Sequence, residues 1–282
     1  MPEWLGIAIA VLYGTIVGSF LNVCIWRMPR DESIVHPGSH CPSCGTLLRA
    51  WDLVPLLSFL VQRCRCRYCG ASITWRYFGV ELLTGLSFGV LYFWFGWGVD
   101  FLAYALFVAA LIAIFFIDLE HWIIPDQLSL FGIVVGIGHD AVGLGMRTQE
   151  PYYLPIPGVG WTLPVPKSVA GMLICGGIFL GLAIVSYYIF KKEGIGGGDI
   201  KLAAAVGANL TLLNGSLWIP LLSFFLAVAL GSMIGVALIA ARKKTRRDYV
   251  PFGPMMVAGA VISLLYGQRI IDAYRQFVGW GG

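Results

Sequence analysis

Two acidic side chains stand at the ends of apolar segments, where chemistry could be done. Asp118 ends the run LFVAALIAIFFID, and Asp199 follows three glycines in GIGGGDIKL. A carboxylate at the depth of a bilayer is costly, so it persists where it pairs, lines a wet cavity or reacts. Two carboxylates that meet cannot both ionise, and they share a proton as an aspartyl protease does. These residues predict the catalytic pair of a membrane-embedded hydrolase.

Residues around this pair are candidates for supporting roles. Gly196 and Gly198 leave the backbone bare, so a bound peptide could approach it closely. A phosphate-binding loop is disfavoured because no strand pattern precedes the glycines and no Lys-Ser/Thr follows them. Glu81 lies near one end of its apolar segment, and we name it and Lys201 as active-site support, although Lys201 is also typical of a side chain that snorkels to the interface. Asp126, after Pro125, indicates a cap or first-turn acid.

Four cysteines form a second candidate site. CPSCG and CRYCG are two C-x-x-C-G turns separated by 21 residues. Each turn aims two thiolates at one point, and two turns supply the tetrahedral set of four sulfurs that zinc prefers. We predict a structural zinc site because four sulfur ligands leave no open position for a catalytic water. Its ligands are Cys41, Cys44, Cys66 and Cys69, with Cys64 as a spare candidate.

The composition indicates that lipid is the main solvent of the elements that position these residues. Hydrophobic residues make up 58% of the 282 residues and charged residues only 12%. A helix needs roughly 20 apolar residues to cross a bilayer. The sequence predicts an all-α membrane protein of about eight such helices, at 4–26, 77–97, 101–118, 127–145, 168–190, 200–216, 217–240 and 252–271. The sixth is short and glycine-rich, so it must be buried against other helices.

The distribution of Lys and Arg predicts the orientation, because short cytosolic loops carry an excess of them. With both termini outside, fifteen of the nineteen basic residues lie on the cytosolic side. This places Asp118 and Asp199 at the cytosolic face. The net charge of +4 then reflects topology, and we expect no nucleic-acid partner. The chain divides into a first transmembrane helix at 1–26, a cytosolic zinc-binding segment at 27–76 and a polytopic protease domain at 77–282.

Taken together, these motifs resemble those of the type IV prepilin peptidase family over nearly the whole chain. GSFLNVCIWRMPR is similar to its amino-terminal signature, the paired C-x-x-C turns to its cytosolic zinc segment, and VPFGPMMVAGA to its Pro-Phe-Gly-Pro turn. IDLEHWIIPDQLSL resembles the region of its first catalytic aspartate and GIGGGDIKLAAAVGA its G-x-G-D region. The resemblance assigns catalysis to Asp118 and Asp199, with Gly196 and Gly198 as motif glycines.

The resemblance also implies a substrate and a second activity. The substrate would be a prepilin or pseudopilin, with a short basic leader in the cytosol and an apolar helix after the cut. The new amino terminus would then be methylated with S-adenosylmethionine as donor. No glycine fingerprint of a Rossmann-type donor site is present in the sequence. The expected location is the bacterial cytoplasmic (inner) membrane, with the active site facing the cytosol.

Two other classes of protein remain as alternatives. A multispan transporter could use Asp118 and Asp199 as a proton or cation relay, but no inverted repeat is evident between the halves. A membrane thiol oxidoreductase would place its C-x-x-C near the oxidising face, whereas these cysteines are predicted to be cytosolic. The sequence indicates neither the particular pilins, nor the methyl-donor site, nor the oligomeric state, nor a role for residues 145–167.

Overall fold

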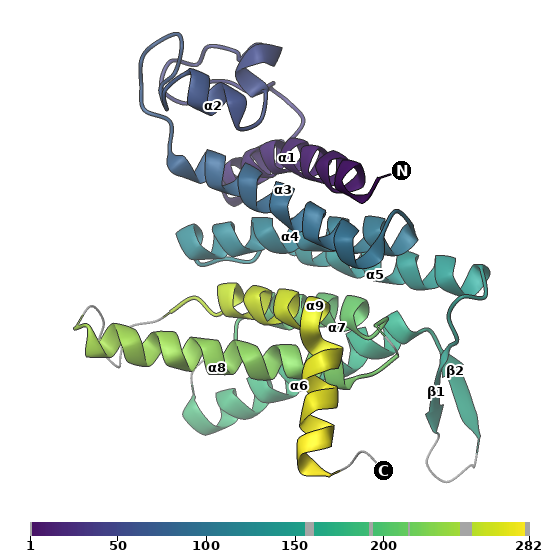
Figure 1. The fold of residues 1–282 in the computed structure, drawn as a ribbon. Coiled ribbons are helices and arrows are strands. Elements are labelled where there is room, and N and C mark those ends of the chain that lie inside the picture. The colour runs from purple at the N-terminus through teal and green to yellow at the C-terminus, as the bar shows by residue number, and fades with distance from the viewer. Residues whose placement is uncertain (1, 156–160, 192–193, 214, 243–249, 280–282) are drawn as a thin grey trace. The chain divides into compact units, whose positions relative to one another are not determined.

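The computed structural model describes residues 2–155, 161–191, 194–213, 215–242 and 250–279. The chain divides into two compact units, Met1–Ile117 and Asp118–Gly282. Within each unit the arrangement of the helices can be followed in Figure 1.

All eight apolar ranges of the sequence form helices in the described chain. They are α1 Glu3–Arg27, α3 Trp75–Phe95, α4 Val99–His121, α5 Asp126–Gly145, α6 Lys167–Phe190, α7 Gly197–Leu210, α8 Trp218–Ala240 and α9 Gly253–Val278. Seven of the eight are long and apolar enough to cross a bilayer, and α7 is the exception. At 14 residues α7 is about 21 Å long, which is less than the thickness of a bilayer core. The fold is therefore that of a multi-pass, almost entirely helical membrane protein.

In the first unit α1 and α3 pack closely through small residues (Figure 1). A Cβ on Gly14 would lie 2.7 Å from the Thr84 carbonyl oxygen, and one on Gly18 would lie 2.7 Å from the Cα of Glu81. Hydrophobic burial gives little drive for association between helices in lipid, so close backbone contact at small residues supplies much of the packing energy. Asn22 adds a hydrogen bond at 3.0 Å from its Nδ2 to the Tyr77 carbonyl oxygen.

The polar segment between α1 and α3 is built from short elements. They are the 3₁₀ helices η1 Met28–Arg30 and η2 Ala50–Leu53 and the helix α2 Leu57–Val61. Asp52 is the centre of this segment, because its side chain accepts hydrogen bonds from the Arg49 N–H, the Gln62 amide and the Tyr68 hydroxyl. Because the segment has few apolar side chains to bury, hydrogen bonds such as these must contribute much of its stability.

In the second unit α7 packs against α5 and α6, and α8 packs against α9. Gly171 of α6 and Gly207 of α7 each face the other's backbone carbonyl, so neither position has room for a Cβ. Asn209 is fully buried in α7 and donates to the Gly132 carbonyl oxygen of α5 at 2.9 Å. The prediction that this short helix must be buried is confirmed, since Leu202, Ala203 and Ala205–Leu210 are all buried.

Two antiparallel strands form in the described part of residues 145–167, a range for which the sequence predicts no role. They are β1 Tyr152–Pro155 and β2 Thr162–Val165, paired from Tyr152 with Val165 to Pro155 with Thr162. The start of α6 just after β2 is held by Asp140 of α5, whose Oδ2 accepts from both the N–H and the hydroxyl of Ser168. This carboxylate is fully buried and accepts a hydrogen bond from one of the first N–H groups of α6, which the helix itself leaves unpaired.

Candidate active site and cysteine cluster

Asp118 lies in the last turn of α4, and its side chain is almost completely buried, with 5% of the residue exposed. Its Oδ2 accepts a hydrogen bond of 3.0 Å from the backbone N–H of Gly253, the first residue of α9. The carbonyl oxygen of Asp118 accepts from Trp122, which has a φ of +61° and turns the chain away from the helix. The carboxylate is thus fixed at a helix end by a residue far along the chain.

Asp199 lies in the first turn of α7 and is partly exposed. Its backbone N–H donates to the Gly196 carbonyl oxygen at 3.1 Å, and its Oδ2 accepts from the Gly196 N–H at 3.2 Å. This reciprocal pair closes the helix start in the manner of a capping box, although the first partner is a glycine and contributes only backbone. The G-x-G-D sequence therefore fixes its own aspartate.

The two carboxylates are bordered by glycines that face one common side chain. Ile124, in the turn between α4 and α5, lies beside both of the glycines that border them. A Cβ on Gly198 would be 2.9 Å from the Cβ of Ile124, and a Cβ on Gly253 would be 3.3 Å from its Cδ1 and 2.5 Å from Oδ2 of Asp118. Gly198 and Gly253 must therefore be glycines for a packing reason, whereas Gly197 faces open space.

The other residues near the pair differ in how closely they are held. Lys201 forms an ion pair with Asp126, with 2.6 Å between Nζ and Oδ2. Asp126 was predicted to be either a cap or a first-turn acid of α5. It is a first-turn acid, and no side-chain capping hydrogen bond is present at this helix start. Both side chains are at least half exposed, so the pair contributes at most about 1 kcal/mol to stability.

Glu81, predicted to support the active site, has its partner in the first unit. It is buried in α3, and its Oε2 accepts a hydrogen bond of 2.8 Å from the N–H of Leu56. Leu56 has a φ of +60°, a conformation that few residues other than glycine adopt. Glu81 therefore joins a transmembrane helix to the strained turn that precedes α2.

Sequence reasoning did not identify Gly253 and Ile124 as parts of this site. The Pro-Phe-Gly-Pro turn was recognised by resemblance only, without a role for its glycine. The sequence feature that could have indicated this role is Pro254, in the first turn of α9. Proline is common there because the first N–H groups of a helix have no partner within it, so Pro254 marks the helix start. The N–H of Gly253 is left unpaired by the helix itself, so it is available to Asp118.

The four cysteines predicted as metal ligands come together in the first unit. The sulfurs of Cys41, Cys44, Cys66 and Cys69 all lie within 4.8 Å of one another. The two turns that carry them have the same geometry: Gly45 donates to the Cys41 carbonyl oxygen and Gly70 to that of Cys66, and both glycines have a φ near +70°. Cys64, the spare candidate, does not belong to the cluster.

The thiols of Cys44 and Cys69 in this cluster have pKa values shifted in opposite directions. The Thr46 hydroxyl beside Cys44 lowers the pKa of that thiol to about 6. The Ala71 N–H acts in the same direction on Cys69, but burial and the neighbouring sulfurs outweigh it and raise the pKa of Cys69 to about 11. Four thiolates so close together repel one another, and a bound cation would relieve that repulsion. The donor set therefore fits a tetrahedral metal ion.

Two models of known protein families match the chain. Residues 12–95 match the Bacterial Peptidase A24 N-terminal domain, and residues 105–240 match the Type IV leader peptidase family. Among curated proteins, the chain is similar to "Prepilin leader peptidase/N-methyltransferase" of Myxococcus xanthus, at 37% identity over 86% of this chain and 66% of the relative. The proteins of that name from Bacillus subtilis and Pseudomonas aeruginosa are each 30% identical, over 95% and 96% of this chain and 97% and 93% of theirs. No solved structure matches.

Proposed function

Because this chain belongs to the type IV leader peptidase family, we propose that it is a membrane aspartyl endopeptidase that removes the short basic leader of prepilins and pseudopilins. The observation that carries the proposal is that Asp118 and Asp199 lie in the same unit, each accepting a backbone hydrogen bond and each beside a glycine that faces Ile124. The relatives give no support to the alternative of a transporter.

The chemistry follows from two carboxylates that share one proton. The ionised one takes a proton from a water held between them, while the protonated one donates to the scissile carbonyl oxygen. The resulting diol collapses, the peptide carbon–nitrogen bond breaks, and a proton passes to the leaving amine. The pair titrates as one unit, so a pH profile of cleavage reports on both residues together. No metal is needed for this step.

The relatives' shared name supports a second activity, N-methylation of the new amino terminus. S-adenosylmethionine, when bound, would supply an electrophilic methyl group. The one sheet of the described residues is a two-stranded antiparallel hairpin, so a Rossmann-type donor site does not fit this part of the chain. We therefore assign no residue to the donor. The peptidase step depends only on the aspartates.

We assign the cysteine cluster to a structural zinc ion, because four sulfurs within 4.8 Å suit its tetrahedral preference and leave no position open for water. Cys41, Cys44, Cys66 and Cys69 would hold it. The metal would contribute folding free energy to a polar segment that buries few apolar side chains. Cys41 and Cys66 are buried and Cys44 and Cys69 are exposed, so the ion would lie at the edge of the segment.

The proposed location is the bacterial cytoplasmic (inner) membrane. Seven helices are suited to span it, and the excess of basic residues in the segments predicted to lie on the same side as the aspartates supports a cytosolic active site. A basic leader would emerge on that side while the apolar helix of the substrate stays in the bilayer.

Cleavage of a prepilin by the purified protein tests the proposal. Asp118→Asn and Asp199→Asn should each lower the cleavage rate by at least about a thousandfold, because each removes one member of the pair. Asp126→Asn is the matched control, since its ion pair is exposed, and it should retain activity within about threefold. Leader-length product from either dyad variant at the wild-type rate would contradict the proposed function.

A further inference from the structure

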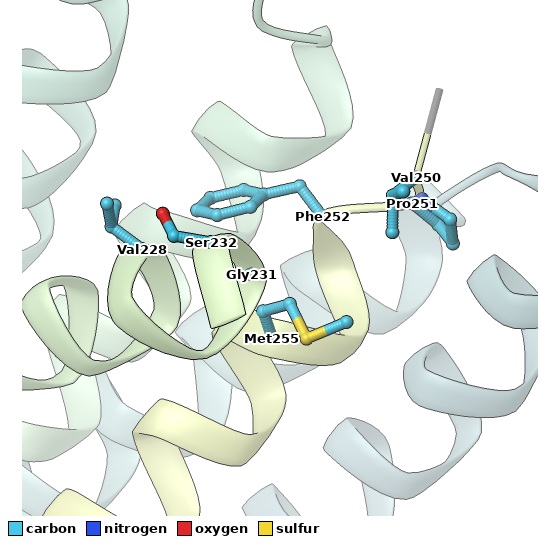
Figure 2. Close-up of a pocket in the computed structure, with 7 residues that line it drawn as sticks. All are labelled: Val228, Gly231, Ser232, Val250, Pro251, Phe252 and Met255. Atoms are coloured by element: carbon cyan, nitrogen blue, oxygen red, sulfur yellow. The ribbon is translucent and has the colours of Figure 1, made fainter. Parts of the chain in front are cut away.

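A pocket of about 280 Å³ lies beside the start of α9 in the second unit. It is lined by Val228, Gly231, Ser232, Val250, Pro251, Phe252 and Met255. Figure 2 shows the Phe252 ring reaching toward Val228 and Ser232 of α8, while Met255 lies beside Gly231. The pocket is thus formed where the Pro-Phe-Gly-Pro turn meets α8.

The chemistry of the lining is apolar. None of the lining residues is charged, and Ser232 supplies the one polar side chain. Ligand sites for whole small molecules usually enclose roughly 300–1,000 Å³, so this pocket is at the small end and has room for a side chain or a short piece of chain. A basic leader would leave its charges unpaired in such surroundings, which is unfavourable.

The pocket adjoins the proposed catalytic pair. Phe252, which forms one wall, directly precedes Gly253, and the Gly253 N–H donates to Asp118 at 3.0 Å. The pocket wall and the hydrogen bond to Asp118 therefore come from consecutive residues of one turn. On the other side Val228 is 58% exposed on a transmembrane helix, so the pocket can be reached from the lipid.

We propose that this pocket binds the apolar side chain of the residue that follows the cleaved bond in the substrate. The inference depends on the proposed function, since it takes from it a substrate with a polar leader before the cut and an apolar helix after it. Of the two sides of the cut, only the apolar one matches the lining. The pocket then holds the first turn of the substrate helix while the leader remains in water.

Gly231 sets the depth of the pocket in this arrangement. A Cβ there would lie 3.6 Å from Cγ of Met255 and 4.0 Å from Cε2 of Phe252, both ordinary contact distances. A side chain at 231 would therefore project between these two lining residues without a backbone clash. Gly235, one turn further along α8, has no neighbour within 4 Å of such a Cβ, and it provides a matched position outside the pocket.

The test compares two purified prepilin substrates that differ only in having Leu or Ala directly after the cut. The wild type should prefer the Leu substrate by kcat/KM. Gly231→Leu should lower cleavage of the Leu substrate by about tenfold or more and change that of the Ala substrate by less than about threefold, because a filled pocket rejects only the larger side chain. Gly235→Leu should leave the Leu/Ala ratio at the wild-type value.

The ratio of rates does not depend on how much of a variant is folded, because both substrates meet the same enzyme. Gly231→Ala, which fits at ordinary contact distances, should shift the ratio in the same direction by a smaller factor. A Leu/Ala ratio that stays at the wild-type value in both Gly231 variants overturns this inference while leaving the peptidase intact. A wild type that cleaves neither substrate overturns the proposed function and the pocket's role with it.

Discussion

Gly253 holds Asp118 through its backbone N–H and has no room for any side chain, since a Cβ at 253 would lie 2.5 Å from the Asp118 Oδ2 that it binds. The two residues are 135 positions apart in the chain. One glycine therefore both supplies a donor to the proposed catalytic carboxylate and leaves the space that the carboxylate occupies.

Replacing this glycine should displace the carboxylate without removing it. Gly253→Ala should lower kcat/KM for leader cleavage by roughly 100-fold, since a shift of about 1 Å at a reacting group can have that effect. Steady-state cleavage of a prepilin measures this, with Gly235→Ala as the control because it adds the same methyl group in open space. Activity of the Gly253 variant equal to that of the control would show that the contact is unimportant.

The glycines before Asp199 offer a comparison of neighbouring positions. Gly198→Ala should lower the cleavage rate by at least about tenfold, because its Cβ would lie 2.9 Å from the Cβ of Ile124 and the start of α7 would have to move. Gly197→Ala should stay within about twofold, since nothing lies within 4 Å of a Cβ at that position. Equal losses at the two positions would mean that helix propensity or backbone freedom matters more than packing.

The metal content of single cysteine variants tests the zinc site. Cys41→Ser should lower the bound zinc from about one ion per chain to well below one, because it removes one of four ligands. Cys64→Ser should keep the wild-type content, since that sulfur is outside the cluster. Elemental analysis of protein purified without chelator gives the measurement. If the two variants lose zinc equally, the ligand set assigned here is wrong.

Zinc removal should separate the two activities if the donor site lies near the cysteines. Chelation would then abolish methylation of a pre-cleaved substrate while leader cleavage continues, because the aspartates use no metal. Assays of both steps on the same chelated sample make the comparison. Parallel loss of both would indicate general unfolding of the protein instead.

The lowered pKa of Asp52 predicts how the stability of the segment between α1 and α3 depends on pH. Although burial opposes it, the Tyr68 hydroxyl, the Arg49 N–H and the nearby Arg67 hold the pKa of Asp52 below its ordinary value. A carboxylate with a lowered folded-state pKa stabilises the fold above its unfolded-state pKa of about 4, and that contribution disappears as the pH falls through the folded-state value.

Asp52→Asn should therefore destabilise the segment between α1 and α3 at neutral pH by about 1.5–3 kcal/mol, the range for hydrogen bonds to a charged group. Hydrogen exchange of residues 49–69 in the intact protein measures the difference from the wild type. The difference should shrink toward zero as the pH falls below about 4. A difference that persists undiminished at low pH would rule out the charge of Asp52 as its cause.

Much of this architecture could be predicted because it depends on local patterns. The eight apolar ranges became helices because length and composition decide what can lie in a bilayer, and the cysteines met because each C-x-x-C-G turn is a self-contained geometry. The hydrogen bond between Gly253 and Asp118 links residues that are 135 positions apart in the sequence, so no local pattern predicts it. The partner of Glu81 likewise depends on how a loop folds back onto α3.

The apolar side chain of Ile124 packs against the backbone on both sides of the proposed active site. The glycines that border Asp118 and Asp199 both face this one hydrocarbon side chain, which carries no charge of its own. The backbone beside each acid is therefore positioned by a group that protons cannot alter. A change of acidity should then modulate how fast this site works without reshaping it.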